Sequence, residues 1–286
     1  LPVVWLGGPP WRGSATRALS RAVSTPESHD VDVLILGGGL AGLTLGMQLQ
    51  RRRAGIRLLV ADKAPWPPPA AAHKVGESTV ELASHYLREV LGLREYLEAE
   101  QLPKLGLRFF FDAGVRDDLA QRPEMGATGR LPVPSHQLDR GTLEKELGER
   151  YVAAGGTHLV SHRVGAIDLH RDGHTVTLKG PAGEVTVRAR WVVDATGRAS
   201  TLKRKLGLLE PNDHTANAVW FRVDEEIDLD DFCADPAWRA RVKPGLRRLS
   251  TNHLMGDGYW VWFIPLASGS TSVGIVTDGP QHDLKA

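Results

Sequence analysis

The sequence has a single cysteine, Cys233, among its 286 residues, so no disulfide can form within one chain. Neither a Cys-x-x-Cys nor a His-Glu-x-x-His pattern is present, and no metal site is predicted. No apolar run approaches the roughly 18 residues that a membrane helix needs. Charges nearly balance, with 35 Lys and Arg against 34 Asp and Glu, which gives no electrostatic reason to expect a nucleic-acid or membrane partner. These absences favour a soluble, cytoplasmic protein that acts on a small molecule.

The beginning of the chain differs from the rest. Residues 1–30 lack an initial methionine and are rich in Pro, Gly, Arg and Ser, with no sustained hydrophobic period. We therefore expect a disordered leader over 1–30, outside the fold. The remaining chain is long enough for one large domain or two small ones.

A glycine cluster follows a short apolar strand and opens an apolar helix. Gly37, Gly39 and Gly42 form Gly-x-Gly-x-x-Gly, and Asp62 ends the next strand, 20 positions (62 minus 42) after Gly42. Gly37 permits a tight turn, Gly39 lets backbone N–H groups approach a pyrophosphate, and Gly42 lets helix and strand pack closely. Asp62 can accept hydrogen bonds from ribose hydroxyls. The pattern predicts a dinucleotide site, but it does not distinguish FAD from NAD.

The segments further along the chain favour FAD. Short strand-like runs joined by turns at 171–173 and 181–183 are typical of an antiparallel meander, and the apolar run 191–194 then ends in Asp194-Ala195-Thr196-Gly197. This order resembles flavoproteins, in which the second half of the Rossmann core returns to the flavin and an Asp-Ala-Thr-Gly turn lies beside it. The resemblance implies FAD contacts at Asp194 and Gly197, and an ordinary turn closing a strand is the alternative. The expected meander strands are 163–169, 174–178 and 185–189.

Two polar residues stand where helices can begin. Ser78 and Asp139 each precede a run with apolar residues at helical spacing, and both residue types are common N-caps. Beyond Leu206 the pattern changes to longer strands around a short helical segment. The expected strands are 216–223, 259–265 and 270–276, and the helical segment is 230–242.

These elements predict an α/β fold in two parts. We expect a Rossmann-type FAD-binding domain from 31–103 and 136–206, which combines a parallel sheet with an antiparallel β-meander. We expect part of a second, mainly antiparallel sheet on the substrate side from 104–135 and 207–286.

One motif points to a narrower family. Trp260, Trp262, Ile264 and Pro265 match the Trp-x-Trp-x-Ile-Pro pattern of flavin-dependent halogenases at every fixed position. The chain therefore resembles the tryptophan halogenase-like family within the hydroxylase-type FAD-dependent monooxygenases. This resemblance covers 31–276 and places the motif near the flavin. Tryptophans at alternate positions of an ordinary core strand are the alternative reading.

The resemblance extends to further site residues. The stretch 75–79 is similar to the family's Val-Gly-Glu-[Ala/Ser]-Thr segment, which wraps the flavin and begins a helix, so Gly76, Glu77 and Ser78 are implied to contact the cofactor. Lys104 falls where halogenases carry a catalytic lysine just before a strand. Arg140, at an expected helix start, resembles the arginine that contacts FAD in the superfamily.

The family's chemistry implies a role for Lys104. Reduced flavin (FADH2) and O2 form a flavin hydroperoxide, which oxidises chloride or bromide to hypohalous acid. A desolvated lysine can hold this acid or capture its halogen and deliver it to an electron-rich arene such as a phenol, pyrrole or indole. Because no NAD(P)H site is evident, a separate flavin reductase is expected as a partner.

Two other functions remain open. A single-component aromatic hydroxylase would use the same flavin chemistry with NAD(P)H, although Ala195-Thr196-Gly197 departs from the Asp-Gly turn of many such enzymes. A flavin-binding fragment without catalysis is the second alternative. It arises because the family continues with a Gly-Asp segment, a catalytic glutamate and a lid that this chain lacks, so we expect a truncated carboxyl terminus.

Overall fold

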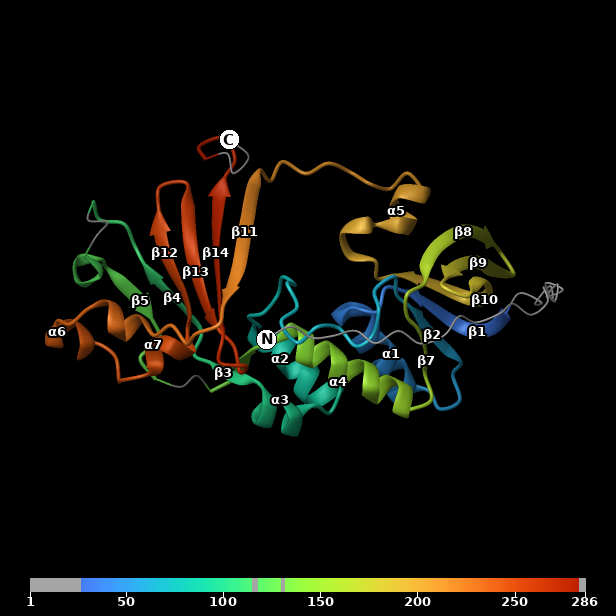
Figure 1. The fold of residues 1–286 in the computed structure, drawn as a ribbon, viewed down its shortest axis with the longest axis horizontal. Helices are drawn as coiled ribbons and strands as arrows, with labels where there is room; N and C mark the ends of the chain where they lie inside the picture. The colour runs from blue at the N-terminus through green and yellow to red at the C-terminus, as the bar shows by residue number, and fades with distance from the viewer. Residues whose placement is uncertain (1–26, 115–117, 130–131, 283–286) are drawn as a thin grey trace, which may run out of the picture.

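Two six-stranded sheets form the framework of the protein, with helices α1 to α4 between and below them (Figure 1). The computed structural model describes residues 27–114, 118–129 and 132–282. The first sheet has the strand order β7-β2-β1-β10-β9-β8, parallel from β7 to β10 and antiparallel from β10 to β8. Its strands are β1 (Glu27–Leu36), β2 (Leu58–Ala61), β7 (Thr157–Leu159), β8 (Arg163–His170), β9 (Gly173–Gly180) and β10 (Gly183–Asp194). The expected parallel sheet with an antiparallel meander is confirmed.

The first strand begins earlier than predicted. Residues 1–26 of the expected leader lie outside the described residues, but residues 27–30 belong to β1. The polar sequence Glu-Ser-His-Asp gave no strand signal, because its extension depends on a distant partner: Glu27 to Val31 pair with residues 185–189 of β10. The leader boundary at residue 30 was therefore wrong.

Strand β10 is one continuous element, whereas the sequence predicted two strands, 185–189 and 191–194. Arg190 interrupts the apolar pattern but not the extended backbone. The strand is held on one edge by β9 over residues 183–189 and on the other by β1 over residues 185–194. This single strand joins the meander to the parallel core.

Helices cover one face of the first sheet. Val33 and Ile35 of β1 are buried against Leu43 of α1 and against Leu143 and Leu147 of α4. The helices in this layer are α1 (Leu40–Arg52), α2 (Glu81–His85), the π-helical turn η1 (Tyr86–Val90), α3 (Arg94–Glu100) and α4 (Arg140–Ala153). After β10 come η3 (Gly197–Ala199) and α5 (Thr201–Lys205).

The two expected N-caps have other partners. Helix α2 begins at Glu81 after Val80, three residues beyond Ser78, so the prediction that Ser78 caps it was wrong. Ser78 instead bridges to Gln137, and its hydroxyl lies 2.7 Å from that of Thr251. Asp139 does stand at the N-cap of α4, but its side chain makes no capping hydrogen bond.

The second sheet has the strand order β11-β14-β13-β12-β4-β5, and its only parallel pair among the described strands is β12–β4. Its strands are β4 (Leu107–Phe110), β5 (Glu124–Gly126), β11 (Ala216–Val223), β12 (Thr251–Gly256), β13 (Tyr259–Pro265) and β14 (Thr271–Asp278). Strand β12 was not predicted. A tight turn at Asp257-Gly258 joins it to β13.

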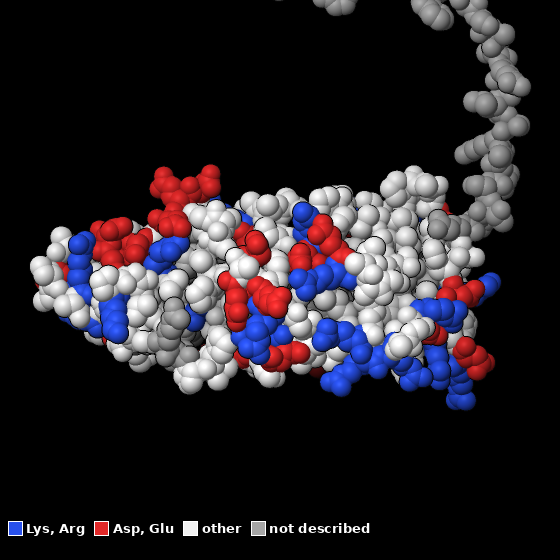
Figure 2. Space-filling view, turned by 90° about the horizontal axis from the view of Figure 1, so that it is seen from below, with Lys and Arg blue, Asp and Glu red and all other residues white. Residues whose placement is uncertain are grey.

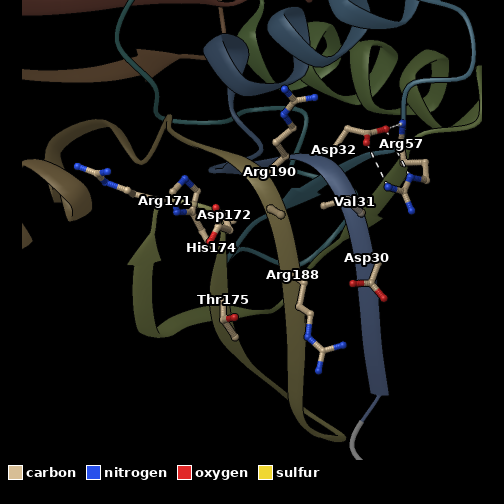
Figure 3. A pocket seen from close by; sticks show the side chains of 12 residues that line it. Asp30, Val31, Asp32, Arg57, Arg171, Asp172, His174, Thr175, Arg188 and Arg190 are labelled. Atoms are coloured by element: carbon tan, nitrogen blue, oxygen red, sulfur yellow. Dashed lines mark hydrogen bonds and ion pairs between the residues drawn. The ribbon is translucent and has the colours of Figure 1, made fainter.

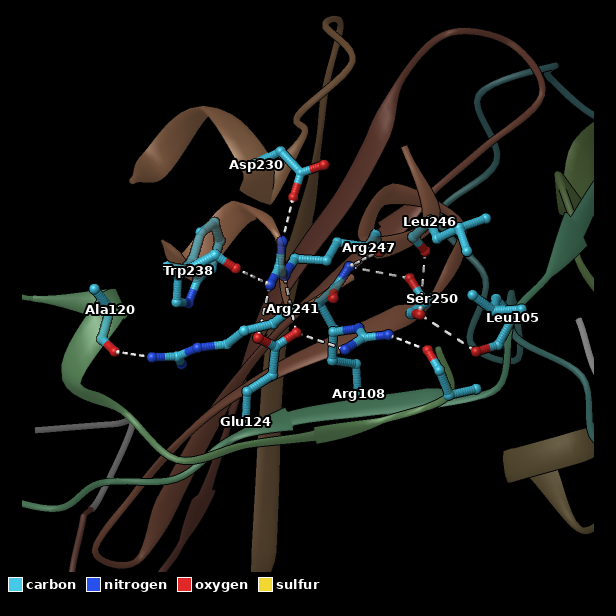
Figure 4. A network of polar contacts seen from close by, with 12 residues as sticks. Leu105, Arg108, Ala120, Glu124, Asp230, Trp238, Arg241, Leu246, Arg247 and Ser250 are labelled. Carbon is cyan, nitrogen blue, oxygen red and sulfur yellow. Dashed lines mark hydrogen bonds and ion pairs between the residues drawn. The ribbon is translucent and has the colours of Figure 1, made fainter. Parts of the chain in front are cut away.

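Segments between β11 and β12 cover one face of the second sheet. The expected helix over 230–242 is two short pieces, η4 (Leu229–Phe232) and α6 (Pro236–Arg239), and α7 (Leu246–Leu249) follows. Arg108 and Arg247 both bind Glu124 (2.5 and 2.8 Å), and Arg247 stacks on Trp238, 3.7 Å from the ring centroid (Figure 4). Because these charges are buried and paired, removing one partner would leave a buried charge uncompensated.

A small sheet lies between the two large ones. Strands β3 (Leu102–Lys104) and β6 (Ser135–Gln137) pair antiparallel, and the short helix η2 (Leu119–Gln121) lies in the segment between them. The β3–β6 pair spans both predicted domain boundaries, at 103/104 and at 135/136. The division into two domains stays a prediction.

The surface seen from below carries charges of both signs. Lys and Arg side chains lie among Asp and Glu side chains over much of this face (Figure 2). Among the described residues, no helix is both long and apolar enough to span a membrane.

Candidate functional site

A cavity of about 1080 Å³ opens at the carboxyl ends of β1, β2 and β10 and extends to β11 of the second sheet. Ligands of open α/β sheets bind outside the carboxyl ends of the parallel strands. Of the predicted site residues, the cavity is lined by Gly37, Gly39, Asp62, Arg140 and Gly197.

The three glycines of the motif have different local roles. A Cβ on Gly37, whose φ is +112°, would lie 2.2 Å from the carbonyl oxygen of Ala195, and one on Gly42 would lie 1.9 Å from that of Gly37. Gly39 has nothing within 4 Å of its Cβ position, and it is the N-cap of α1 without a side-chain cap. Gly37 and Gly42 therefore serve packing, and Gly39 leaves open space where N–H groups at a helix start can meet an anion.

Asp62 supports the glycine loop. One carboxylate oxygen accepts a hydrogen bond from the Gly38 N–H (2.5 Å), and the other accepts from the Ala64 N–H (2.7 Å). Asp62 also lines the cavity. Its contact with a ribose hydroxyl stays a prediction.

Asp194 shapes the turn that faces the glycine loop. It accepts hydrogen bonds from the Thr196 hydroxyl (2.6 Å) and from the Leu202 N–H (2.7 Å). Burial raises the pKa of Asp194, but hydrogen bonds from Thr196, Leu202 and Lys203 outweigh burial and lower the pKa overall. The carboxylate therefore fixes the backbone of the turn, while Gly197 (φ +60°) reaches the cavity.

Arg140 ties α4 to the segment 75–79, which we call the strap. Its guanidinium donates to the carbonyls of Val75 and Gly76 and to Glu144, and Glu144 also binds Lys74. The Nε of Arg140 is buried without a partner among the described residues. A buried donor without a partner needs an explanation, and Arg140 is one of the residues that line the cavity.

The strap is joined to the second sheet by buried polar side chains. Glu77 forms a hydrogen bond with Ser272 of β14 and lies close to Arg222 of β11. Arg222 in turn binds Asp139, with 2.8 Å between Nη2 and Oδ2. Burial raises the pKa of Glu77, although Ser272 and the arginines oppose this shift. These contacts of Glu77, Asp139, Arg222 and Ser272 connect the strap to the second sheet, and we call them the joint. Glu77 belongs to the joint and does not line the cavity.

Lys104 lies behind the strap. Its side chain is buried, with only 9% of the residue exposed, and Nζ donates to the carbonyl of Thr79 (2.6 Å). Burial lowers the pKa of Lys104, and Glu81 partly opposes this. Thr79 is itself held to His136 by hydrogen bonds from both its backbone N–H and its hydroxyl. Lys104 is therefore a positioned, desolvated ammonium close to the strap and outside the cavity lining.

The tryptophan motif lies on β13 and contacts the same joint. The indole N–H of Trp262 points to the hydroxyl of Ser272 (3.4 Å), which is the partner of Glu77. Trp260 is half-buried, and Ile264 and Pro265 are buried. The strap and the tryptophan motif thus both contact Ser272.

A second hollow lies away from the motifs. It is open and lined by residues of both charges around the middle of β1 and β10, among them Asp32 and Arg57, which form an ion pair (3.1 Å, Figure 3). This location is away from the carboxyl ends of the strands, so it does not match the usual ligand position of such sheets. Among the described residues, no group of three or more His, Cys, Asp or Glu could hold a metal ion.

Sequence reasoning missed several residues of the site. Trp220 and Lys74 line the cavity, and Arg222 and Asp139 form the joint. The alternation along β11 is the one local signal, because it places Trp220 and Arg222 on the same face. It does not show that this face meets the strap and α4, which depends on the packing of distant segments.

Comparisons with known proteins agree with this geometry. A family described as "FAD binding domain" matches residues 30–268. The chain is 27% identical over 271 residues to a flavin-dependent halogenase, chlA, of Dictyostelium discoideum, covering 85% of this chain and 44% of that protein. It is 32% identical over 219 residues to 6-methylpretetramide 4-monooxygenase of Streptomyces rimosus, covering 72% and 35%. The crystal structure of a mutant of the halogenase PltM in complex with FAD has the same fold (TM-score 0.73, 22% identity, 88% of this chain and 52% of that chain).

The expected resemblance to flavin-dependent halogenases is confirmed by these similarities. The chain spans about half the length of the halogenases it matches, 44% in one case and 52% in the other.

Proposed function

The chain belongs to the FAD binding domain family of FAD-dependent oxidoreductases, and we propose that it forms the flavin-binding part of an enzyme that halogenates electron-rich aromatic compounds. The observation that carries this proposal is the buried Lys104, held behind the strap by Thr79. An aromatic hydroxylase has no step that needs such a lysine, whereas a halogenase must hold and direct hypohalous acid.

The residues around the cavity fit FAD. Gly39 leaves open space at the start of α1, where free N–H groups suit a pyrophosphate. Asp62 would accept from the ribose hydroxyls, and the turn at Gly197 would lie beside the flavin ring. Arg140 lines the cavity, and its buried Nε–H has no partner among the described residues. When bound in its reduced form, FAD together with O2 supplies the oxidising power that converts chloride or bromide to hypohalous acid.

Lys104 would act on that acid. An ammonium removed from water forms stronger hydrogen bonds than one on the surface, and its lowered pKa eases the release of a proton to the departing oxygen. The strap carbonyl of Thr79 would hold Nζ in one position until the acid arrives. Glu77, Ser272 and Trp262 would keep the strap and the tryptophan motif in a fixed relation.

An aromatic hydroxylase is the second candidate, because a monooxygenase is among the similar proteins at 32% identity. The two functions differ in how flavin is reduced. We expect the FAD-loaded protein to oxidise NADH or NADPH no faster than free FAD does, and to form product only when a flavin reductase is added. Absorbance at 340 nm measures this. Rapid NADPH oxidation by the protein alone, stimulated by a phenol, would contradict the halogenase proposal and support the hydroxylase.

A further inference from the structure

A row of aromatic side chains crosses one face of the second sheet. The strand register aligns Phe109 of β4, His253 of β12 and Trp262 of β13, then Gly274 of β14 and Trp220 of β11. The four rings are half-buried. Residues directly opposite each other across strands share a face, so the four rings lie on one face of the sheet, and we call these four residues the aromatic row. Within this row the rings of Phe109 and His253 are in direct contact.

Gly274 leaves room for the indole of Trp262 to lie against the backbone of β14. A Cβ on Gly274 would lie 2.3 Å from the indole of Trp262, so this ring occupies the space above β14. At one end Trp220 lines the cavity, and further along the row His253 is close enough to Lys104 for the lysine charge to act on it. Aromatic side chains on one sheet face, with Trp220 at the cavity, suit a stacked aromatic ligand.

His253 is the one titratable side chain in this row. Its Nδ1 lies 3.3 Å from the carbonyl oxygen of Arg108, and its ring stacks on Phe109 with 5.0 Å between centroids. Because a carbonyl oxygen only accepts hydrogen bonds, Nδ1 must carry the hydrogen, and the neutral ring then has its lone pair on Nε2.

The Nε2 atom is available to a ligand. The hydrogen bond to the Arg108 carbonyl uses Nδ1, and Nε2 is not among the fully buried side-chain atoms of the described residues that lack a partner. Burial lowers the pKa of His253. Hydrogen bonding to the Arg108 and Thr251 backbone opposes this, while the Lys104 charge lowers the pKa further. These effects favour the neutral imidazole, which is the form that can accept a proton.

We propose that His253 accepts, through Nε2, the hydroxyl proton of a phenolic substrate that stacks on the aromatic row. This inference rests on the proposed halogenase function and narrows its substrate class to hydroxyarenes. Removing the hydroxyl proton makes the ring more electron-rich at the moment when electrophilic halogen arrives, so a positioned base accelerates the reaction.

Proton transfers at Lys104 and His253 accompany the halogenation of the phenol. A ring carbon ortho or para to the hydroxyl forms a bond to halogen, the halogen–oxygen bond of hypohalous acid breaks, and the leaving hydroxide takes a proton from Lys104 Nζ to become water. His253 takes the hydroxyl proton, which leaves a halogenated cyclohexadienone. The ring proton then passes to the Lys104 amine, and His253 returns its proton to the oxygen. The products are the halophenol and water.

The test compares phenol with anisole, whose methylated oxygen has no proton to give. In the complete FAD-loaded protein with a flavin reductase, His253→Phe keeps a stacked ring but has no base, and His253→Asn keeps a donor for the Arg108 carbonyl. We expect both variants to lower kcat/KM for phenol by about 100-fold, the lower end of general-base effects, and to leave the value for anisole unchanged. His170→Phe, at an exposed hairpin residue, is the matched control. Equal losses on both substrates would mean a structural role and would overturn the proposal.

A binding measurement separates this inference from the proposed function. Equilibrium dialysis of phenol and anisole against the oxidised FAD-loaded protein needs no halogenation. We expect His253→Phe to weaken phenol binding about tenfold, the equivalent of one hydrogen bond of about 1.4 kcal/mol, with no change for anisole. Equal phenol binding by the variant and the unsubstituted protein would overturn the proposal. Intact, His253-dependent phenol binding without any halogenated product would instead count against the halogenase function alone.

Discussion

Replacing Lys104 with alanine is expected to lower the rate of halogenation at least about 1000-fold, within the range seen when a group that acts only in the transition state is lost. The ammonium is buried and held by the Thr79 carbonyl, so no surface lysine can take its place. FAD affinity should change by less than about twofold, because Lys104 does not line the cavity. Product formation by mass spectrometry and FAD affinity by fluorescence titration measure the two effects.

Lys145→Ala is the matched control for this prediction. Lys145 lies on the exposed side of α4 and pairs with Glu149 (3.7 Å, both side chains 53% exposed), and surface pairs of this kind contribute little. This control should retain full activity. If Lys104→Ala still produced the halogenated compound at the original rate, Lys104 would have no part in the mechanism.

Replacing Gly39 with alanine should weaken FAD binding at least about 100-fold, which corresponds to about 2.7 kcal/mol, while the protein still folds. The added methyl group meets no atom within 4 Å in the protein itself, so folding is not affected. It does project into the space at the start of α1 where backbone N–H groups would approach the pyrophosphate. Circular dichroism melting and FAD titration separate the two quantities.

Two other glycines serve as controls for Gly39→Ala. Gly129→Ala also introduces a methyl group with nothing within 4 Å, away from the cavity, and should leave both folding and FAD binding unchanged. Gly37→Ala would force a Cβ against the Ala195 carbonyl at a φ of +112°, so this variant should lose stability as well as FAD. Unchanged FAD affinity in Gly39→Ala would show that the cofactor does not lie on the glycine loop.

The β-α-β unit was predictable because its signals are local. Gly37, Gly39 and Gly42 lie within six residues, and Asp62 follows the next strand, so sequence spacing alone places them at one sheet edge. The resemblance likewise identified the strap and the tryptophan motif. It did not show that the two meet, because the contact of Glu77 with Ser272 joins residues far apart in the chain.

The remaining errors come from contacts between distant segments. Ser78 is a good helix cap by residue type, but it is 173 positions from Thr251, the partner that its hydroxyl finds in the folded protein. Strand β12 has an irregular sequence, Thr-Asn-His-Leu-Met-Gly, and is extended because β4 and β13 pair with its two edges. The same pairing brings His253 into the aromatic row, so no local pattern could have singled it out.

The central claim is that this site halogenates an aromatic compound, and product mass tests it most directly. The complete protein would be incubated with FAD, a flavin reductase, NADH, O2 and bromide, together with a panel of phenols, pyrroles and indoles. We expect a product with the bromine isotope doublet that is absent without the protein, and phenols as the best substrates. A product that gains oxygen and no bromine would rule out the halogenase and identify a hydroxylase, and bound FAD with no product from any arene would rule out catalysis.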